Sequence, residues 1–244
     1  MILSTHQPYF CPYPGFFFKA MESDIFVLLD SVQFPRGTTW ISRNRFKNDQ
    51  GTLWLTIPVY KKGLGLQRID RVRICYDGNW TGKHRESIRV AYGRSPYLEE
   101  HWPLMDRVFS GNYETLVELN LEVIGYVAHL LGVRAEILRL SELEIHTRGT
   151  ALILEICRTL GADRYLTQAS AAKYLDTSLF EKAGIVLESF QPPSPVYPQL
   201  WGDFIPNLSV LDLLFNCGPK SREILLRASK TRPLPPAGTG IGPA

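Results

Sequence analysis

The sequence lacks the features that place a chain across a membrane or direct it out of the cell. No window approaches the roughly 20 uninterrupted apolar residues that a membrane-spanning helix needs. The first three residues, Met1 to Leu3, lead directly into polar residues, without the basic and apolar regions of a signal peptide. We therefore expect a cytoplasmic protein that does not insert into a membrane.

Cysteine is scarce, and its spacing excludes the common metal-binding and redox motifs. The four cysteines stand at positions 11, 75, 157 and 217, so no C-x-x-C pair exists. The five histidines are also scattered, and none lies in the H-E-x-x-H spacing of a metal site. We expect free thiols in a reducing compartment and no structural metal. The G-x-G-x-x-G fingerprint is missing too, and the sequence assigns no cofactor.

Negative charge is sparse in one quarter of the chain. Residues 36–94 hold 13 Lys or Arg against 4 Asp or Glu, a local charge of +9, whereas the whole chain carries only +3. This asymmetry indicates an anionic partner such as a phosphate, a pyrophosphate or nucleic acid. Solvated basic loops would give the same count, so the charge alone does not select a partner.

The beginning of the chain predicts a βαβ unit. Residues 2–5 form a short apolar run, and residues 25–29 ("IFVLL") form a run typical of a strand buried on both faces. A proline-rich turn and a short helix over residues 16–22 separate them. This order implies a parallel pair of strands with a right-handed crossover.

The rest of the chain alternates between helices and strands. Apolar periodicity and caps predict helices over residues 81–93, 95–109, 114–132, 149–161, 176–184, 207–218 and 219–229. Further strands are expected over residues 53–59, 69–74, 134–138, 164–167 and 185–190. The fold class is therefore α/β, a single domain over residues 1–230 with a largely parallel sheet, a βαβ start and a helical middle segment. We expect the Pro/Gly-rich tail, residues 231–244, to be disordered.

Candidate site residues follow the expected strands, because ligands of parallel α/β sheets bind outside the carboxyl ends of the strands. His6 and Gln7 follow the first strand, Asp30 and Gln33 follow the second, and Gln168 follows the strand over residues 164–167. Pro14-Gly15 leads directly into the first helix, whose start is a natural anion site.

The stretch "WISRNRFK" is the densest polar cluster. Arg43 and Arg45 offer guanidinium forks suited to phosphate or carboxylate, Asn44 offers an amide, and Trp40 offers a stacking face. In a strand, the two arginines share one face and Asn44 points to the other. An exposed basic hairpin would have the same composition.

The stretch "STHQPYFCPYPGFF" raises a separate question, whether His6 and Cys11 form a reactive pair. His6 and Cys11 are five residues apart, with Pro8 between them and Pro12 directly after Cys11, so contact between the two side chains is conceivable but not enforced. Chemistry alone disfavours Cys11 as a nucleophile.

Several blocks together resemble the WbqC-like protein family, over residues 1 to about 229 and in the family's order. The blocks are "HQPYFCPYPGFFFK", "DIFVLLDSVQF", "WISRNRF", "LTIPV", "SPYLEEHWPLM", "YLDTSLFEKAGI" and "YPQLWGDFIPNLSVLDLLFNCG". The resemblance implies a cytoplasmic bacterial protein of O-antigen, capsule or other polysaccharide biosynthesis, or of secondary metabolism. It implies no particular reaction.

The resemblance also changes which candidate residues we favour for the site. Cys11 is not part of the family's opening motif, and His6 becomes an accessory group. The residues that match the motif are Gln7, Pro8, Tyr9, Pro12, Tyr13, Gly15 and Phe16. The other matching polar positions are Asp24, Asp30, Gln33, Arg43, Asn44, Arg45, Tyr174, Tyr197, Gln199, Ser209 and Asp212.

Our leading hypothesis is a transferase (acyl, aminoacyl or nucleotidyl) that acts on an anionic activated metabolite, such as a nucleotide sugar or a carrier-bound acyl group. Asp30, with His6, is the expected general base. The expected substrate-binding residues are Gln7, Tyr9, Tyr13, Lys19, Gln33, Arg43, Asn44, Arg45, Gln168, Tyr174, Gln199 and Asp212. The alternative is a non-catalytic protein that binds a glycan precursor or serves as a scaffold. A nucleic-acid binder is disfavoured, because no nucleic-acid motif is present.

Overall fold

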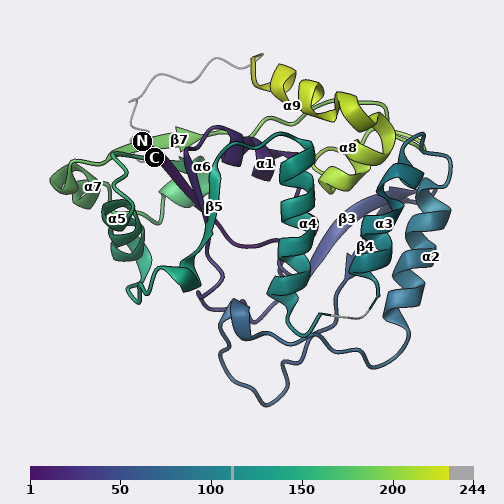
Figure 1. Cartoon of the computed structure of the whole chain (residues 1–244), viewed down its shortest axis with the longest axis horizontal. Helices are drawn as coiled ribbons and strands as arrows, with labels where there is room; N and C mark the ends of the chain where they lie inside the picture. The colour runs from purple at the N-terminus through teal and green to yellow at the C-terminus, as the bar shows by residue number, and fades with distance from the viewer. Residues whose placement is uncertain (111–112, 231–244) are drawn as a thin grey trace, which may run out of the picture.

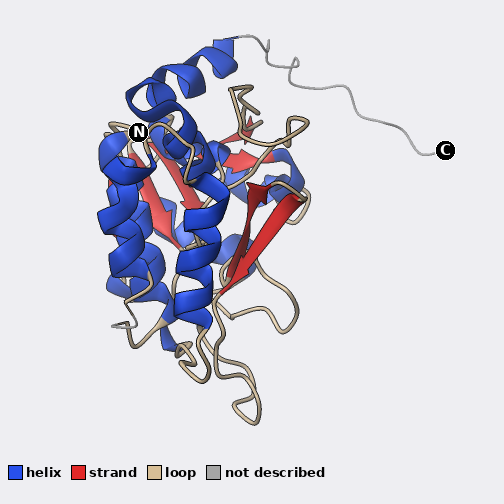
Figure 2. Ribbon diagram, turned by 90° about the vertical axis from the view of Figure 1, so that its right-hand side faces the viewer, coloured by secondary structure: helices blue, strands red, loops and turns tan. Residues whose placement is uncertain are grey.

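The computed structural model describes residues 1–110 and 113–230, and a parallel β-sheet lies at its centre (Figures 1 and 2). The strand order is β5-β2-β1-β6-β7, and every neighbouring pair is parallel. The strands are β1 (Ile2–His6), β2 (Ile25–Leu28), β5 (Glu136–Arg139), β6 (Arg164–Gln168) and β7 (Val186–Phe190). The predicted α/β class, parallel sheet and βαβ start are confirmed. The tail predicted over residues 231–244 lies outside the described residues.

The remaining elements form a hairpin and a helical shell. The hairpin of β3 (Arg43–Asn48) and β4 (Gly51–Thr56) stands apart from the sheet (Figure 2). The helices are α1 (Pro14–Met21), α2 (Trp80–Tyr92), α3 (Leu98–Val108), α4 (Leu116–Leu130), α5 (Gly149–Thr159), α6 (Ala169–Ala172), α7 (Thr177–Ala183), α8 (Val210–Cys217) and α9 (Ser221–Lys230). Helices α2, α3 and α4 are the predicted helical middle segment.

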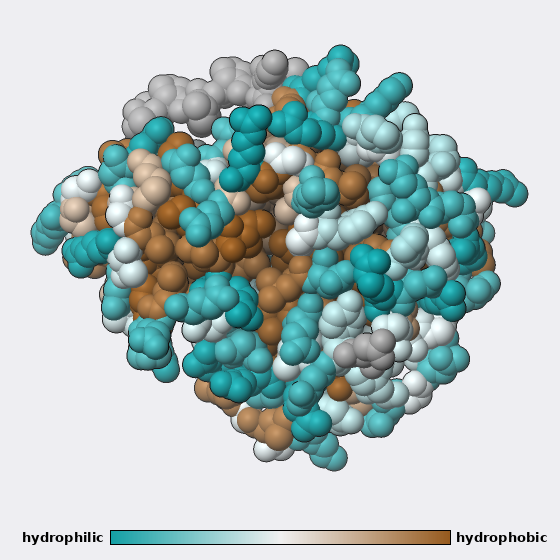
Figure 3. All heavy atoms as spheres, in the orientation of Figure 1, coloured by the Kyte–Doolittle hydropathy of each residue, from teal (hydrophilic) through white to brown (hydrophobic). Residues whose placement is uncertain are grey.

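The sheet is covered on both faces, as the apolar run of β2 predicts. Ile25 and Val27 pack with residues of α5 and α7 on one face, whereas Phe26 and Leu28 pack with α1, α4 and α8 on the other. Successive side chains of a strand point to opposite faces, so an unbroken apolar run is what a central strand of a three-layer structure requires. Figure 3 shows further apolar residues gathered over the edge strand β5, between α5 and α4.

One predicted strand is wrong. Residues 69–74 contain a single 3-10 turn, Ile69–Arg71, and two isolated bridges, Val59 with Ile74 and Arg73 with Thr115. Ile69 and Val72 are buried, and this burial produces the strand-like apolar pattern. The segment pairs with one residue at a time from two different neighbours, so no ladder forms.

The chain order of the strands creates a topological switch point. The chain moves outward from β1 to β2 and β5, then returns to the other side of β1 to form β6 and β7. The loop that leaves β1 at this point, residues 7–13, must therefore cross the carboxyl edge of the sheet. It contains Pro8 and Pro12, which have no backbone N–H to donate.

Two buried asparagines supply the donors that this loop lacks. The Asn44 amide nitrogen on β3 donates to the carbonyls of Phe10 (2.9 Å) and Cys11 (2.7 Å). The Asn120 amide nitrogen on α4 donates to the carbonyl of Pro8 (2.8 Å) and also to that of Ile41 (2.8 Å). Buried carbonyls need such partners, so these amides hold the loop against the hairpin and the helical layer.

Replacing Asn44 with alanine should destabilise the fold by about 2–4 kcal/mol, because two buried carbonyls lose their donor. The free energy of unfolding, from a denaturant titration, measures this loss. Gln50→Ala, at the exposed turn of the same hairpin, is the matched control and should change stability little. Equal stability of the two variants would mean that the asparagine is not needed to hold the loop.

Candidate functional site

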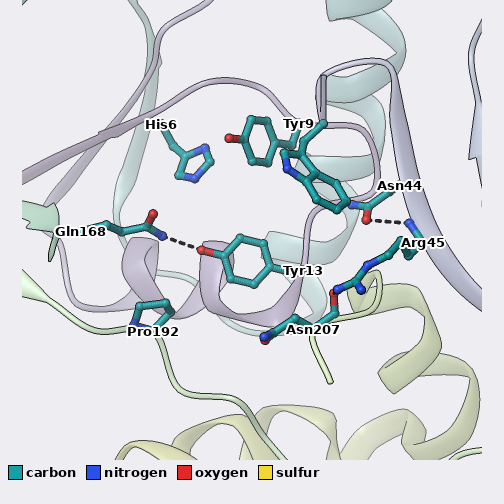
Figure 4. A pocket seen from close by; sticks show the side chains of 9 residues that line it. His6, Tyr9, Tyr13, Asn44, Arg45, Gln168, Pro192 and Asn207 are labelled. Atoms are coloured by element: carbon teal, nitrogen blue, oxygen red, sulfur yellow. Dashed lines mark hydrogen bonds between the residues drawn. The ribbon is translucent and has the colours of Figure 1, made fainter. Parts of the chain in front are cut away.

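A cavity of about 350 Å³ lies at the switch point, between the carboxyl ends of β1 and β6 (Figure 4). Strand β1 contributes its last residue, the following loop contributes two tyrosines, and β3 contributes an asparagine and an arginine. The lining residues are His6, Tyr9, Tyr13, Trp40, Asn44, Arg45, Gln168, Pro192 and Asn207. Aromatic rings therefore form much of the wall, and polar groups from four separate segments converge on it.

His6 is neutral and its tautomer is set by the backbone. Its Nδ1 lies 2.9 Å from the carbonyl oxygen of Gln7, which can only accept, so Nδ1 carries the proton and Nε2 keeps its lone pair. The ring packs edge-on against Tyr9 and Phe16, with centroids at 4.5 Å and 4.8 Å. Burial, and then the nearby charge of Lys19, lower the pKa of His6 to about 3. His6 thus presents an acceptor rather than a cation.

Lys19 lies close to His6 but does not line the cavity. Its Nζ donates to the carbonyl of Thr5 (2.8 Å), and the side chain is buried. Burial lowers the pKa of Lys19 to about 7, because the charged form loses its hydration. When it is charged, Lys19 therefore affects the site by lowering the pKa of His6.

The opposite wall joins the first loop to β6. The Gln168 amide nitrogen donates to the hydroxyl oxygen of Tyr13, as the dashed line in Figure 4 shows. Burial raises the pKa of Tyr13 to about 12 and also raises that of Tyr9. Both phenols stay protonated at neutral pH and can act as neutral hydrogen-bonding groups toward a ligand.

Arg45 is the charged group of the cavity. Its Nη2 donates to the backbone carbonyls of Pro206 (3.3 Å) and Asn207 (3.0 Å), which fix the guanidinium plane. Its Nε is buried and has no hydrogen-bond partner within the described residues. No Asp or Glu belongs to the described residues that line the cavity. An oriented guanidinium that forms no ion pair within the described residues, beside a lining without a carboxylate, suits an anion.

The other predicted arginine, Arg43, lies outside the cavity. Strand β3 places Arg43 and Arg45 on one face and buries Asn44 on the other, as the alternation of a strand predicts. The Arg43 guanidinium carbon stacks 3.7 Å from the ring centroid of Trp54. The ring centroids of Trp54 and Trp40 are 5.6 Å apart. Arg43 therefore braces the aromatic pair that borders the cavity.

Asp30, the predicted general base, also lies outside the cavity. It is buried, and Ser141 donates to both of its carboxylate oxygens, from the backbone nitrogen (2.9 Å) and from the hydroxyl (2.6 Å). These bonds attach the carboxyl end of β2 to the turn that follows β5. Asp30 is placed to fix this turn rather than to meet a ligand beside His6.

The remaining predicted residues lie away from the cavity lining. Gln7 is half-buried, Gln33 is exposed, and Tyr174 is 76% exposed on the segment after α6. Gln199 accepts from Lys47 Nζ and closes a loop with Ile205. Asp212 is buried in α8 and accepts from the Tyr92 hydroxyl (2.7 Å), and burial raises its pKa. Gln199 therefore connects the 199–205 loop to β3, and Asp212 connects α8 to α2.

Six predicted residues come together in the cavity: His6, Tyr9, Tyr13, Asn44, Arg45 and Gln168. Pro192 and Asn207 were not predicted. Pro192 lies two residues beyond β7, so the strand-end rule could have found it. Asn207 has a left-handed backbone (φ 55°), and nothing in the sequence around it signals a site.

Cys11 is placed where it cannot react. The thiol is buried, and burial raises its pKa well above the ordinary value, so it stays protonated. Its own carbonyl is one of the two that accept from Asn44.

Among the described residues, no group of three His, Cys, Asp or Glu side chains could hold a metal ion. No helix within residues 1–110 and 113–230 is long and apolar enough to cross a membrane.

Gly15→Ala should destabilise the protein by about 1–3 kcal/mol through overpacking beside the cavity. A Cβ at Gly15 would lie 2.5 Å from both the Tyr13 ring and the Pro192 Cβ. Gly125→Ala, in the middle of α4 with nothing within 4 Å of its Cβ, is the control. The control should be more stable than the wild type by about 0.5–1 kcal/mol. Denaturant titration compares them, and a fully stable Gly15→Ala would contradict the close packing.

Lys19 should make stability rise with pH. Its pKa is about 7 in the fold against 10.5 when exposed, so the unfolded chain binds more protons between these values. The free energy of unfolding should therefore increase between about pH 7 and pH 9, and Lys19→Met should flatten this slope. Lys182→Met, exposed on α7, should leave the slope as it is. A slope unchanged in Lys19→Met would show that another group causes it.

Comparison with known proteins shows that most of the chain is similar to the members of one protein family. The chain is 29% identical over 222 residues to "Uncharacterized protein Rv1507c" of Mycobacterium tuberculosis, covering 90% of this chain and 95% of that protein. No solved structure matches the chain. The model of the WbqC-like protein family matches residues 7–224, which include every strand except β1, and all but one of the residues that line the cavity. The chain belongs to the WbqC-like protein family.

Proposed function

We propose that the protein is a transferase that binds an anionic activated metabolite in the cavity at the switch point. The observation that supports this most strongly is Arg45, whose guanidinium is held by two backbone carbonyls and has no ion-pair partner among the described residues, in a cavity whose described lining contains no carboxylate. A phosphate or another anionic group in the cavity would supply the negative charge that this guanidinium lacks within the described residues.

His6 is the proposed general base, in place of Asp30. Its unprotonated Nε2 can accept a proton, but a pKa of about 3 makes free His6 a weak base. A bound anion would raise this pKa by favouring the imidazolium form, and would so oppose the effect of Lys19. The base would then become effective only when the substrate is bound.

The proposed step is a group transfer to a hydroxyl or amine. The acceptor's proton passes to Nε2 of His6 as the acceptor oxygen or nitrogen bonds to the transferred group. The bond to the leaving group breaks, and the electron pair stays on that phosphate or thiolate. Arg45 balances the charge that develops there, as a fixed cation does in a low-dielectric site.

The pathway belongs to the proposal as well. The family resemblance implies surface-glycan, such as O-antigen or capsule, or secondary-metabolite biosynthesis, with a nucleotide sugar or a carrier-bound acyl group as the activated substrate. A cytoplasmic location and a single domain over residues 1–230 remain predictions that accompany it.

A second candidate is a non-catalytic protein that binds a glycan precursor. The low pKa of His6 favours it, since a histidine of pKa about 3 serves well as a hydrogen-bond acceptor and poorly as a base. The aromatic wall of Tyr9, Tyr13 and Trp40 would suit a sugar equally well.

Arg45→Ala should weaken binding of the anionic ligand roughly ten- to a hundredfold, because a charge-assisted contact is lost. Thermal-shift screening of nucleotides, nucleotide sugars and acyl thioesters identifies the ligand, and calorimetry gives Kd for each variant. Arg158→Ala, an exposed arginine of α5, is the control and should bind as the wild type does. Equal affinities of the two variants would remove Arg45 from the site.

The variant His6→Gln separates the two candidates. For an enzyme, we expect Kd to change little and turnover of the identified ligand with acceptor amines or alcohols to fall about a hundredfold or more. A wild-type protein that binds tightly and turns over no acceptor would favour the binding protein.

A further inference from the structure

A loop over residues 60–67 projects from the lower end of the molecule and exposes apolar side chains (Figures 1 and 2). Leu64 and Leu66 are 52% and 56% exposed, and Tyr60 at the base of the loop is 41% exposed. Figure 3 shows apolar residues among hydrophilic ones at this end of the molecule. Leu64 and Leu66 thus form a small exposed apolar patch at the tip of a projecting loop, and such patches are typical of interaction surfaces.

Hydrogen bonds set the shape of this loop. The Gln67 amide nitrogen donates to the carbonyl of Tyr60 (2.9 Å), and Phe34 N donates to the carbonyl of Gln67 (2.8 Å). Gly63 and Gly65 have left-handed backbones, with φ of 77° and 63°, which turn the chain sharply around Leu64. The exposure of the leucines therefore belongs to a defined turn whose base is attached to the fold.

Basic residues outnumber acidic ones around the loop, although Asp77 lies close to Tyr60, and Cys75 and then Asp77 raise the pKa of Tyr60. Residues 31–48 and 57–69 contain no Asp or Glu. Arg36, Lys61 and Lys62 form no ion pair within the described part of the chain. A hollow of about 300 Å³ lies between the loop and residues 34–36, and both Arg36 and Lys61 line it. Cations beside an apolar tip are complementary to a surface with negative headgroups over hydrocarbon.

We propose that the 60–67 loop attaches the protein to the surface of an anionic lipid bilayer. Leu64 and Leu66 enter the boundary between headgroups and acyl chains, and Arg36 and Lys61 hold a lipid phosphate in the hollow. The protein lies on the membrane and does not span it. The leucines favour a bilayer over nucleic acid, because a phosphate backbone would use the cations and leave the leucines in water.

Vesicle co-sedimentation with the full chain tests this proposal. We expect binding to vesicles that contain phosphatidylglycerol, little binding to vesicles of phosphatidylcholine alone, and weaker binding as salt is added. The double variant L64D/L66D should lower the partition coefficient by at least about tenfold for each leucine lost. The double variant R36A/K61A should lower it by about fivefold for each cation.

Matched controls carry the same changes elsewhere on the surface. Val90→Asp, on a 68% exposed residue of α2, and Lys83→Ala, on the same helix, should bind vesicles as the wild type does. Equal binding of L64D/L66D and Val90→Asp would overturn the proposal. So would failure to bind phosphatidylglycerol vesicles, or binding to a single-stranded oligonucleotide that is lost in R36A/K61A and kept in L64D/L66D. None of these outcomes depends on ligand binding in the cavity.

Discussion

Satisfying the buried carbonyls of a proline-rich loop is the constraint on which the rest of this structure depends. The loop over residues 7–13 crosses the edge of the sheet at the switch point, where residues 8, 10, 11 and 12 are buried and the two prolines cannot donate. Asn44, Asn120 and the backbone nitrogen of Val210 supply the missing donors, to the carbonyls of residues 8, 10, 11 and 12. These donors come from the hairpin, from α4 and from the start of α8, so one short loop joins parts of the chain that lie far apart in sequence.

The same loop gives the cavity its chemical character. It fixes Tyr9 and Tyr13 as neutral phenols, and its first carbonyl sets the tautomer of His6. The charges near the cavity are positive: Arg45 at the wall, with one edge committed to backbone carbonyls, and Lys19 close to His6. Burying Lys19 costs stability at neutral pH, since its charged form loses hydration. A positive potential without a carboxylate in the lining is the property that a bound anion would use.

The two surfaces for which we propose a role both lie beyond the carboxyl ends of the strands. The cavity opens between β1 and β6, and the 60–67 loop attaches through Phe34 to the segment that leaves β2. The two proposals are independent of each other, because they rest on different residues. In the two proposals together, the basic segment contributes Arg45 to a cavity that binds an anionic small molecule, and Arg36 and Lys61 to a loop that binds anionic lipid.

The sequence by itself determined the fold class and several of the residues that line the candidate cavity. Continuous apolar runs at residues 2–5 and 25–29 require burial on both faces, and this requirement needs no knowledge of neighbours. The strand-end rule found His6 and Gln168, and the polar cluster of β3 contained Asn44 and Arg45. Tertiary structure alone separated Arg45 from Arg43 and His6 from Asp30, because pattern identifies the edge of a sheet but not which side chains face one cavity. It also decided residues 69–74, whose alternation reflects burial without a neighbouring strand, and it brought Asn207 to the wall from the far end of the chain.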